Sequence, residues 1–176
     1  MHLSNRDKQI KYALYGLVLC LCSILQNVDG LFLEIGGARC FLLVPVAILL
    51  TIDEDEKIAS LMGFFAGLLW DINSAHHMGF NAVYIMLACF ICSYLTAHMF
   101  RNTFFFNMVC TISASLIYSL SYWLMFIIIP RVEGGVWSLF YFYLPSAIYT
   151  CICAPILYAI FKPIKKKLNK TYDIQQ

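Results

Sequence analysis

Hydrophobic residues run along this chain in long continuous stretches, and short polar segments separate the stretches. A transmembrane helix needs about 20 predominantly apolar residues, whereas a β-barrel strand alternates apolar and polar positions. The continuous pattern therefore predicts an all-α polytopic membrane bundle of about six spans. The predicted helical segments are Tyr12–Val28, Cys40–Ile52, Ile58–Ile72, Ala82–Phe100, Thr103–Pro130 and Trp137–Phe161.

The second and third segments are shorter than an ordinary crossing, which leaves two alternatives. Each crosses the membrane, or the pair forms a re-entrant hairpin with Asp53–Lys57 at its turn. The first segment has the basic start and apolar middle of a signal peptide. Because Gln26-Asn27-Val28 offers no small-residue cleavage site, we expect this segment to be retained as a span.

Composition also points to a membrane protein. The 176 residues are 61% hydrophobic and 12% charged, and the mean hydropathy is +0.76. Soluble domains are about 45–50% apolar and about 25% charged, and a folded surface must expose polar groups to water. We expect one transmembrane domain over residues 12–161, with a short N-terminal segment (1–11) and a basic tail (162–176) on its flanks.

The basic residues predict the orientation of the spans. With six spans and the N-terminus in the cytoplasm, every Lys and Arg except Arg39 and Arg131 falls on the cytoplasmic side. This bias predicts a multi-pass protein of the bacterial cytoplasmic membrane with both termini in the cytoplasm. The run Lys165–Lys167 fits a topology anchor beside the lipid bilayer better than a nucleic-acid site.

Residues that could carry chemistry are few. Most of the eight cysteines lie in apolar segments, and their spacing fits neither a zinc site nor a disulfide framework; Cys40 lies closest to an interface. His76 and His77 share a turn that supplies no third metal ligand. No nucleophile–base set or phosphate-binding glycine loop is present. We therefore expect no metal, no cofactor and no enzyme activity.

Small residues mark the third segment as a helix-packing face. Ala59, Gly63 and Gly67 recur every fourth position, and Asp71 continues the series on the same side of the helix. Such a face packs within the chain or against a partner. Asp71 has two possible roles, because an acid at membrane depth marks a functional site and an acid at a turn can cap backbone amides.

Further packing positions follow in the next segments. Asn81 begins the fourth segment and is a candidate helix cap. The fifth segment repeats the four-residue spacing of small polar residues, which suits helix contact, at Thr111, Ser115 and Ser119. Aromatic residues near the outer interface predict a membrane-interface belt made of Trp123, Trp137, Tyr141 and Tyr143.

The segment from Gly63 to Asn81 resembles the MreD family of rod shape-determining proteins. The family pattern G-F-x-x-G-L-L-x-D is matched by Gly63-Phe64, Gly67-Leu68-Leu69 and Asp71. The pattern L-G-x-N that follows is matched by Met78-Gly79-Phe80-Asn81, with methionine in the leucine position. A short second segment with a proline, here Pro45, is a further family feature.

This resemblance implies a non-catalytic subunit of the complex that builds peptidoglycan along rod-shaped cells. It implies direct binding to MreC, a membrane protein with one span, and association with MreB, RodA and a class B penicillin-binding transpeptidase. The family is also similar in fold to the substrate-binding subunits of energy-coupling-factor vitamin transporters, which gives the alternative function. That alternative requires an Ala-x-x-x-Ala face on the first span, but Ala13 is followed four residues later by Leu17.

Overall fold

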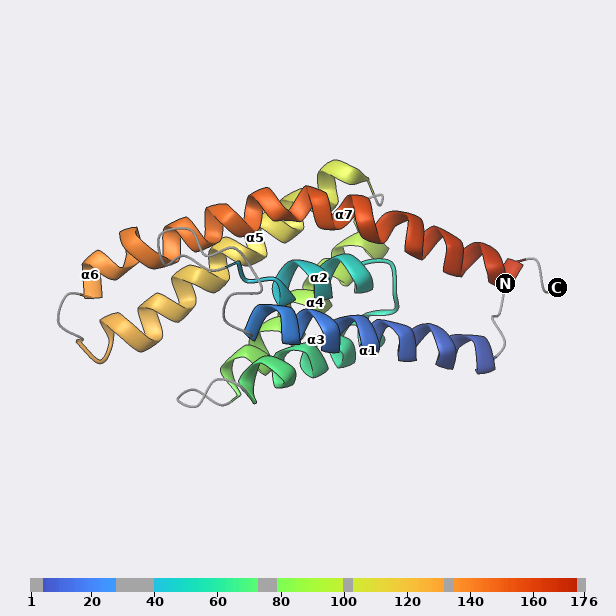
Figure 1. Cartoon of the computed structure of the whole chain (residues 1–176), viewed down its shortest axis with the longest axis horizontal. Coiled ribbons are helices and arrows are strands. Elements are labelled where there is room, and N and C mark those ends of the chain that lie inside the picture. Colours follow the sequence, from blue (N-terminus) through green and yellow to red (C-terminus); the bar gives the residue numbers. More distant parts are fainter. Residues whose placement is uncertain (1–4, 28–39, 73–78, 100–102, 132–134, 174–176) are drawn as a thin grey trace.

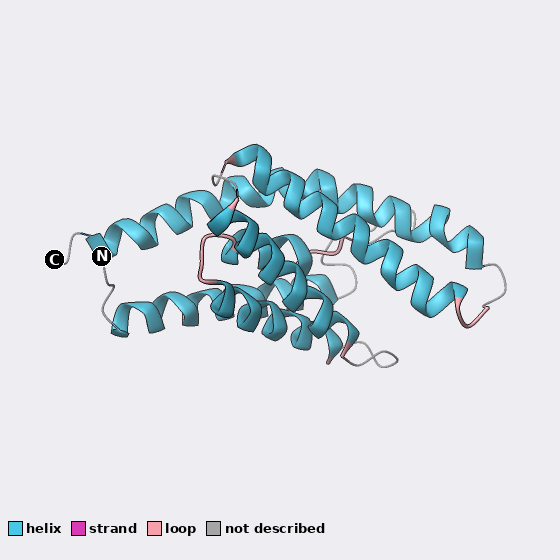
Figure 2. Cartoon of the chain, turned by 180° about the vertical axis from the view of Figure 1, so that it is seen from behind, coloured by secondary structure: helices cyan, strands magenta, loops and turns pink. Residues whose placement is uncertain are grey.

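The structure, a computed structural model, describes residues 5–27, 40–72, 79–99, 103–131 and 135–173. Within these ranges it is helical, without strands, as the hydrophobic pattern predicts (Figure 2). The helices, with two π-helical turns η1 and η2, are α1 (Asn5–Asn27), α2 (Leu43–Thr51), α3 (Glu56–Asp71), α4 (Phe80–His98), α5 (Phe104–Trp123), η1 (Leu124–Ile128), α6 (Gly135–Ser138), η2 (Leu139–Tyr143) and α7 (Leu144–Asp173).

Four of the helical stretches are long and apolar enough to cross a membrane: Lys8–Asn27, Phe80–His98, Phe104–Ile128 and Gly135–Lys165. The other two predicted segments correspond to the shorter helices α2 and α3. The start of α1 and the end of α7 lie at the same end of the bundle, which we call the terminus end (Figure 1). The turn between α2 and α3 lies there too, because its Asp53 and Glu54 pair with Lys165 and Lys11.

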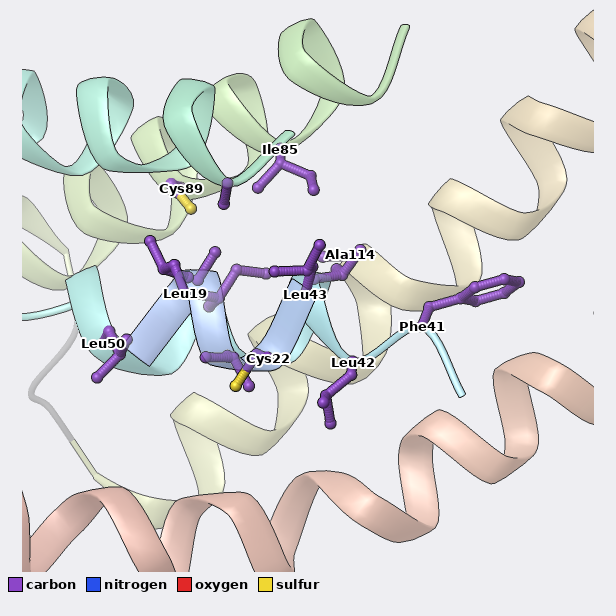
Figure 3. Packing of buried hydrophobic residues seen from close by; sticks show 14 of the residues in the cluster. Leu19, Cys22, Phe41, Leu42, Leu43, Leu50, Ile85, Cys89 and Ala114 are labelled. Atoms are coloured by element: carbon purple, nitrogen blue, oxygen red, sulfur yellow. The ribbon is translucent and has the colours of Figure 1, made fainter. Parts of the chain in front are cut away.

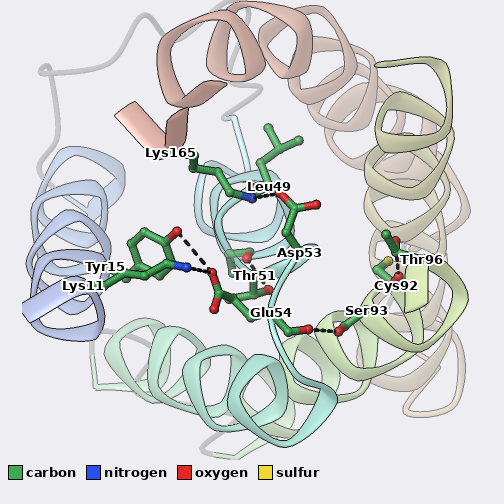
Figure 4. Close-up of polar contacts among 11 residues, drawn as sticks. Lys11, Tyr15, Leu49, Thr51, Asp53, Glu54, Cys92, Ser93, Thr96 and Lys165 are labelled. Atoms are coloured by element: carbon green, nitrogen blue, oxygen red, sulfur yellow. Dashed lines mark hydrogen bonds and ion pairs between the residues drawn. The ribbon is translucent and has the colours of Figure 1, made fainter. Parts of the chain in front are cut away.

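Helix α2 forms the centre of the bundle. Its nine residues span about 14 Å at 1.5 Å per residue, less than half of the roughly 30 Å hydrocarbon layer. All nine are buried. Looking along the bundle, α1, α3, α4 and α7 surround this helix (Figure 4). Leu43 and Leu50 of α2 pack with Leu19 of α1, Cys89 of α4 and Ala114 of α5 in the main hydrophobic cluster (Figure 3).

A buried half-length helix leaves backbone groups that lipid cannot satisfy, so side chains must do so. The N–H of Leu43 donates to Gln26 Oε1 at 2.8 Å, and the N–H of Phe41 donates to Thr150 Oγ1 at 3.0 Å. At the other end of α2, Lys165 Nζ donates to the Leu49 carbonyl at 2.9 Å. Helices α1 and α7 thus hold both ends of α2 in place.

The last helical stretch is longer than predicted. It runs from Gly135 through α6, η2 and α7 to Asp173, with Pro155 and Pro163 inside α7. The expected boundary between a membrane domain and a tail at residue 161 therefore does not coincide with a helix end. With α5 and η1, this stretch forms a long hairpin that extends beyond the other helices, away from the terminus end (Figure 1).

The predicted aromatic belt is only partly correct. Trp137 and Tyr141 are 67% and 73% exposed, as an interface belt requires. Tyr143 is buried instead, and the indole N–H of Trp123 donates to the Gly135 carbonyl at 2.8 Å. These two side chains close the hairpin from inside, so the sequence pattern alone did not separate inward from outward aromatic residues.

Candidate functional site

The small-residue face of α3 packs against α4 of the same chain. A Cβ atom on Gly63 would lie 2.7 Å from the Ile85 carbonyl oxygen, and one on Gly67 would overlap the backbone of Ala82. Ala59 is fully buried on the same side of the helix. The two backbones approach each other because glycine has no side chain to separate them. Since α4 covers this face, it offers no free surface to a partner helix.

Asp71 closes the far end of this contact, opposite to the terminus end. Its carboxylate is buried, with 3% of the residue exposed, and Oδ2 accepts from the N–H groups of Gly79 and Ala82, both at 3.0 Å. Gly79 has a φ of 98°, a left-handed conformation that glycine adopts without strain. Oδ2 thus makes the contacts expected of a capping acid at the start of α4, whereas Oδ1 is buried and has no hydrogen-bond partner among the described residues.

The expectation that Asn81 caps α4 is wrong. The helix begins at Phe80 with Gly79 in the cap position, so Asn81 already lies inside the first turn. Its side chain points to α5, where Oδ1 accepts from the Tyr118 hydroxyl at 2.7 Å. The cap comes instead from Asp71, eleven positions before Ala82, which a search for local capping residues does not detect.

The polar stripe of α5 faces the interior. Thr111, Ser115 and Ser119 are all buried. Each hydroxyl donates to the carbonyl oxygen four residues earlier, at 2.8, 2.9 and 3.2 Å respectively. These hydroxyls are therefore satisfied within their own helix, and the stripe lies on the side of α5 that the bundle buries.

A cluster of charges at the terminus end was not expected from the sequence. Lys11 Nζ lies 2.6 Å from Glu54 Oε1, and both side chains are buried (Figure 4). The hydroxyls of Tyr12 and Tyr15 donate to the same carboxylate at 3.4 Å. Ser93 of α4 donates to the Glu54 backbone carbonyl at 2.6 Å. One glutamate thus joins α1 and α4 to the turn between α2 and α3.

Lys165 makes the corresponding link from α7. Its ammonium group lies 2.7 Å from Asp53 Oδ2 and also donates to the end of α2, where a cation is favoured by the helix dipole. The lysine therefore serves as a buried helix cap rather than as part of an exposed basic tail. A signal was present in the sequence: acids crowd the turn after the second segment, and lysines flank the first and last segments.

A cavity of about 220 Å³ lies at the end of the bundle opposite to the terminus end. We call it the aromatic cavity. It is partly open, and its lining combines aromatic rings with side-chain amides. The lining residues, none of which carries a charge, are Gln26, Asn27, Cys40, Phe41, Trp70, Asn81, Tyr118, Tyr122, Phe142 and Tyr143.

A larger apolar groove of about 830 Å³ separates α4 from α5. Exposed Leu87 and Ile91 from α4 and exposed Phe105 and Val109 from α5 line it, and Ala88 lies between them. The hydroxyl of Tyr84 donates to the Ala114 carbonyl at 2.6 Å across the same two helices. We call this feature the α4–α5 groove.

Metal ligands do not gather in the described part of the chain: no group of three or more His, Cys, Asp or Glu residues is placed to hold an ion there. His76 and His77 lie outside the described residues. The cysteines are free thiols, and Cys22, Cys40, Cys89, Cys92 and Cys110 are buried. Cys40, the one predicted to lie near an interface, lines the aromatic cavity.

Comparison with known families gives a match over most of the chain. The model of the family described as rod shape-determining protein MreD matches residues 7–168. No curated protein and no solved structure matches. The expected similarity to energy-coupling-factor transporter subunits therefore gains no support from known structures.

Proposed function

Since the chain belongs to the MreD family of rod shape-determining proteins, we propose that it is a non-catalytic subunit of the bacterial cell-elongation complex. The family match over residues 7–168 is the observation that carries this proposal. The chain is a membrane protein that acts in determining cell shape. In the proposed complex it supports peptidoglycan synthesis by holding other proteins together rather than by a reaction of its own.

The proposed direct partner is MreC, and MreB, RodA and a class B penicillin-binding transpeptidase belong to the same assembly. We place the chain in the bacterial cytoplasmic membrane with both termini in the cytoplasm. Membrane proteins carry more Lys and Arg on their cytoplasmic side. Lys11 and Lys165 both lie at the terminus end, which supports this orientation.

The α4–α5 groove is the surface that we propose for the single span of MreC. The α3 face is covered by α4, and the α5 stripe is buried, so neither is free to bind. The groove is apolar and exposed along two helices. Ala88 provides the small side chain that allows a helix backbone to approach closely, while the exposed leucine, isoleucine and valine side chains supply dispersion contacts.

Filling the groove tests this assignment. We expect Ala88→Phe to reduce co-purification of MreC about tenfold or more, because the phenyl ring occupies the space of the incoming helix. Ala97→Phe is the matched control, since Ala97 is an exposed alanine of the same helix outside the groove. Equal recovery of MreC with both variants would show that the groove is not the interface.

A cellular experiment tests the function itself. Depletion of the protein should turn rod-shaped cells round and stop directed wall synthesis, and the wild-type gene should restore both. If depleted cells remain rods and instead require an added vitamin, the chain acts in transport and the proposal is wrong.

A further inference from the structure

The aromatic cavity has the size and lining of a binding site for a small molecule. Its 220 Å³ lies between a cavity of about 150 Å³, which holds benzene, and the roughly 300–1,000 Å³ of sites for drug-sized ligands. A molecule about one ring in size therefore fits. Empty cavities in protein interiors are apolar, whereas this one has amides and phenols in its wall and so suits polar contents.

Aromatic rings form a continuous wall of the cavity. Ring centroids lie 5.2 Å apart between Phe41 and Tyr118 and 5.1 Å apart between Trp70 and Tyr118. The Tyr122 and Tyr143 rings are 5.9 Å apart on the hairpin side. The face of an aromatic ring carries partial negative charge, so it attracts the weakly positive C–H groups of a saturated ring.

The side-chain amides of the cavity have N–H groups for which no described residue serves as acceptor. Asn81 is 1% exposed, and Tyr118 occupies its oxygen, but no described residue accepts a hydrogen bond from its Nδ2. Gln26 is half-buried; its oxygen accepts from the Leu43 N–H, and its Nε2 has no described acceptor. Because both amides line the cavity, a ligand that carries hydrogen-bond acceptors can accept from their N–H groups.

The backbone is also irregular at this site. The π-helical turn η2 contains Phe142 and Tyr143, and Tyr122 lies just before η1. A π-helical insertion changes the direction of the side chains around it and is often found at functional sites. The π-helical turn η2 thus contributes two residues to the cavity wall, and η1 begins two residues after a third, Tyr122.

From this geometry we propose that the aromatic cavity binds one uncharged sugar ring that carries an acetamido group. The ring C–H groups pack on the aromatic wall, and the acetamido oxygen and ring hydroxyls accept from Asn81 and Gln26. An anionic ligand finds no counter-charge in the lining, because no lining residue is a lysine or an arginine. This proposal is independent of MreC binding, since the cavity and the α4–α5 groove share no lining residue.

The test titrates N-acetylglucosamine into the full chain in lipid nanodiscs, with calorimetry as the readout. We expect saturable binding with a dissociation constant on the order of 1 mM, as suits so small a ligand. Glucosamine is the matched ligand, because an ammonium group replaces its acetamido group. It should bind at least tenfold more weakly. Tighter binding of glucosamine, or no saturable binding of N-acetylglucosamine, overturns the proposal.

Two pairs of variants connect the binding to the cavity. Asn81→Asp removes the donor and should weaken binding at least tenfold, whereas Asn107→Asp puts the same change at a buried site outside the cavity and should have no effect. Tyr143→Phe removes a phenol of the cavity wall that, in the proposed complex, hydrogen-bonds a ring hydroxyl, and it should weaken binding about threefold. Its control is Tyr84→Phe, which lies in the groove.

These variants also separate this proposal from the proposed function. Co-purification of MreC should be unchanged in Tyr143→Phe. If Asn81→Asp fails to fold, the comparison of Tyr143→Phe with Tyr84→Phe tests sugar binding in the cavity by itself. Equal binding by Tyr143→Phe, Tyr84→Phe and the wild type would place the sugar outside the cavity and overturn the proposal.

Discussion

Helix α4 has two very different neighbours. On one side α3 approaches so closely that Gly63 and Gly67 leave no room for a Cβ atom. On the other side α5 stands away, and a groove of about 830 Å³ runs between the two helices. Across that groove the Tyr84 hydroxyl donates to the Ala114 carbonyl.

The difference teaches what closes a contact between two membrane helices. Both sides of α4 carry small residues: Ala82 and Cys89 face α3, while Ala88 and Cys92 face the groove. Only the first side meets glycines on its neighbour. Small residues on one helix are thus insufficient for close packing. Lipid is as apolar as the side chains, so the helices approach closely only where both carry small residues.

The largest effect on stability is expected where the glycine contact between α3 and α4 is disrupted. Gly67→Ala places a methyl group into the backbone of Ala82, and overpacking of this kind should lower the free energy of unfolding by about 3 kcal/mol. Thermal or denaturant unfolding in detergent, followed by circular dichroism, measures the change. Stability equal to that of the wild type would show that α3 and α4 move apart without cost.

Gly16→Ala is the matched control for this prediction. A Cβ atom there meets only a side-chain carbon of Phe65 at 3.9 Å, which is ordinary contact. Alanine is the better helix former, so this variant should gain roughly 0.5–1 kcal/mol instead. The opposite signs of the two substitutions distinguish close backbone packing from a general intolerance of change at glycine.

A second prediction concerns the charges that hold the closed side of α4. Glu54 accepts from Ser93 of α4 through its carbonyl and pairs with Lys11 through its carboxylate, whereas α5 contains no charged residue. Lys11→Met leaves a buried carboxylate unpaired and should cost about 3 kcal/mol of stability. The double variant Lys11→Met/Glu54→Gln should recover part of this loss, and no recovery would mean that the pair is not the cause.

A third and smaller effect is expected at the far end of the α3–α4 contact. Asp71→Ala removes the acceptor of the Gly79 and Ala82 amides and should cost about 2 kcal/mol, as the loss of a buried cap does. Asp71→Asn keeps one acceptor oxygen and should lose less. If both variants are as stable as the wild type but fail to bind MreC, Asp71 acts in assembly instead of capping.

The sequence predicted the helices of this fold better than the contacts between them. The six apolar segments, the α3 stripe and Asp71 were evident because each is a local pattern. The central place of α2 was not, because a segment that is apolar all round fits both a buried core and contact with lipid. The hydrogen bonds that Thr150 and Lys165 make to Phe41, just before α2, and to Leu49 within it join residues 109 and 116 positions apart.

The smallest effect is expected on the open side of α4. Tyr84→Phe removes the hydrogen bond to the Ala114 carbonyl and should cost about 1 kcal/mol, the usual net value of one hydrogen bond. The same unfolding experiment measures it, and Tyr94→Phe, an exposed tyrosine of α4 outside the groove, is the control. A loss as large as that of Gly67→Ala would show that the groove side stabilises the bundle as much as the glycine contact does. A small loss would show that the open side of α4 contributes less to the stability of the bundle than the contact with α3 does.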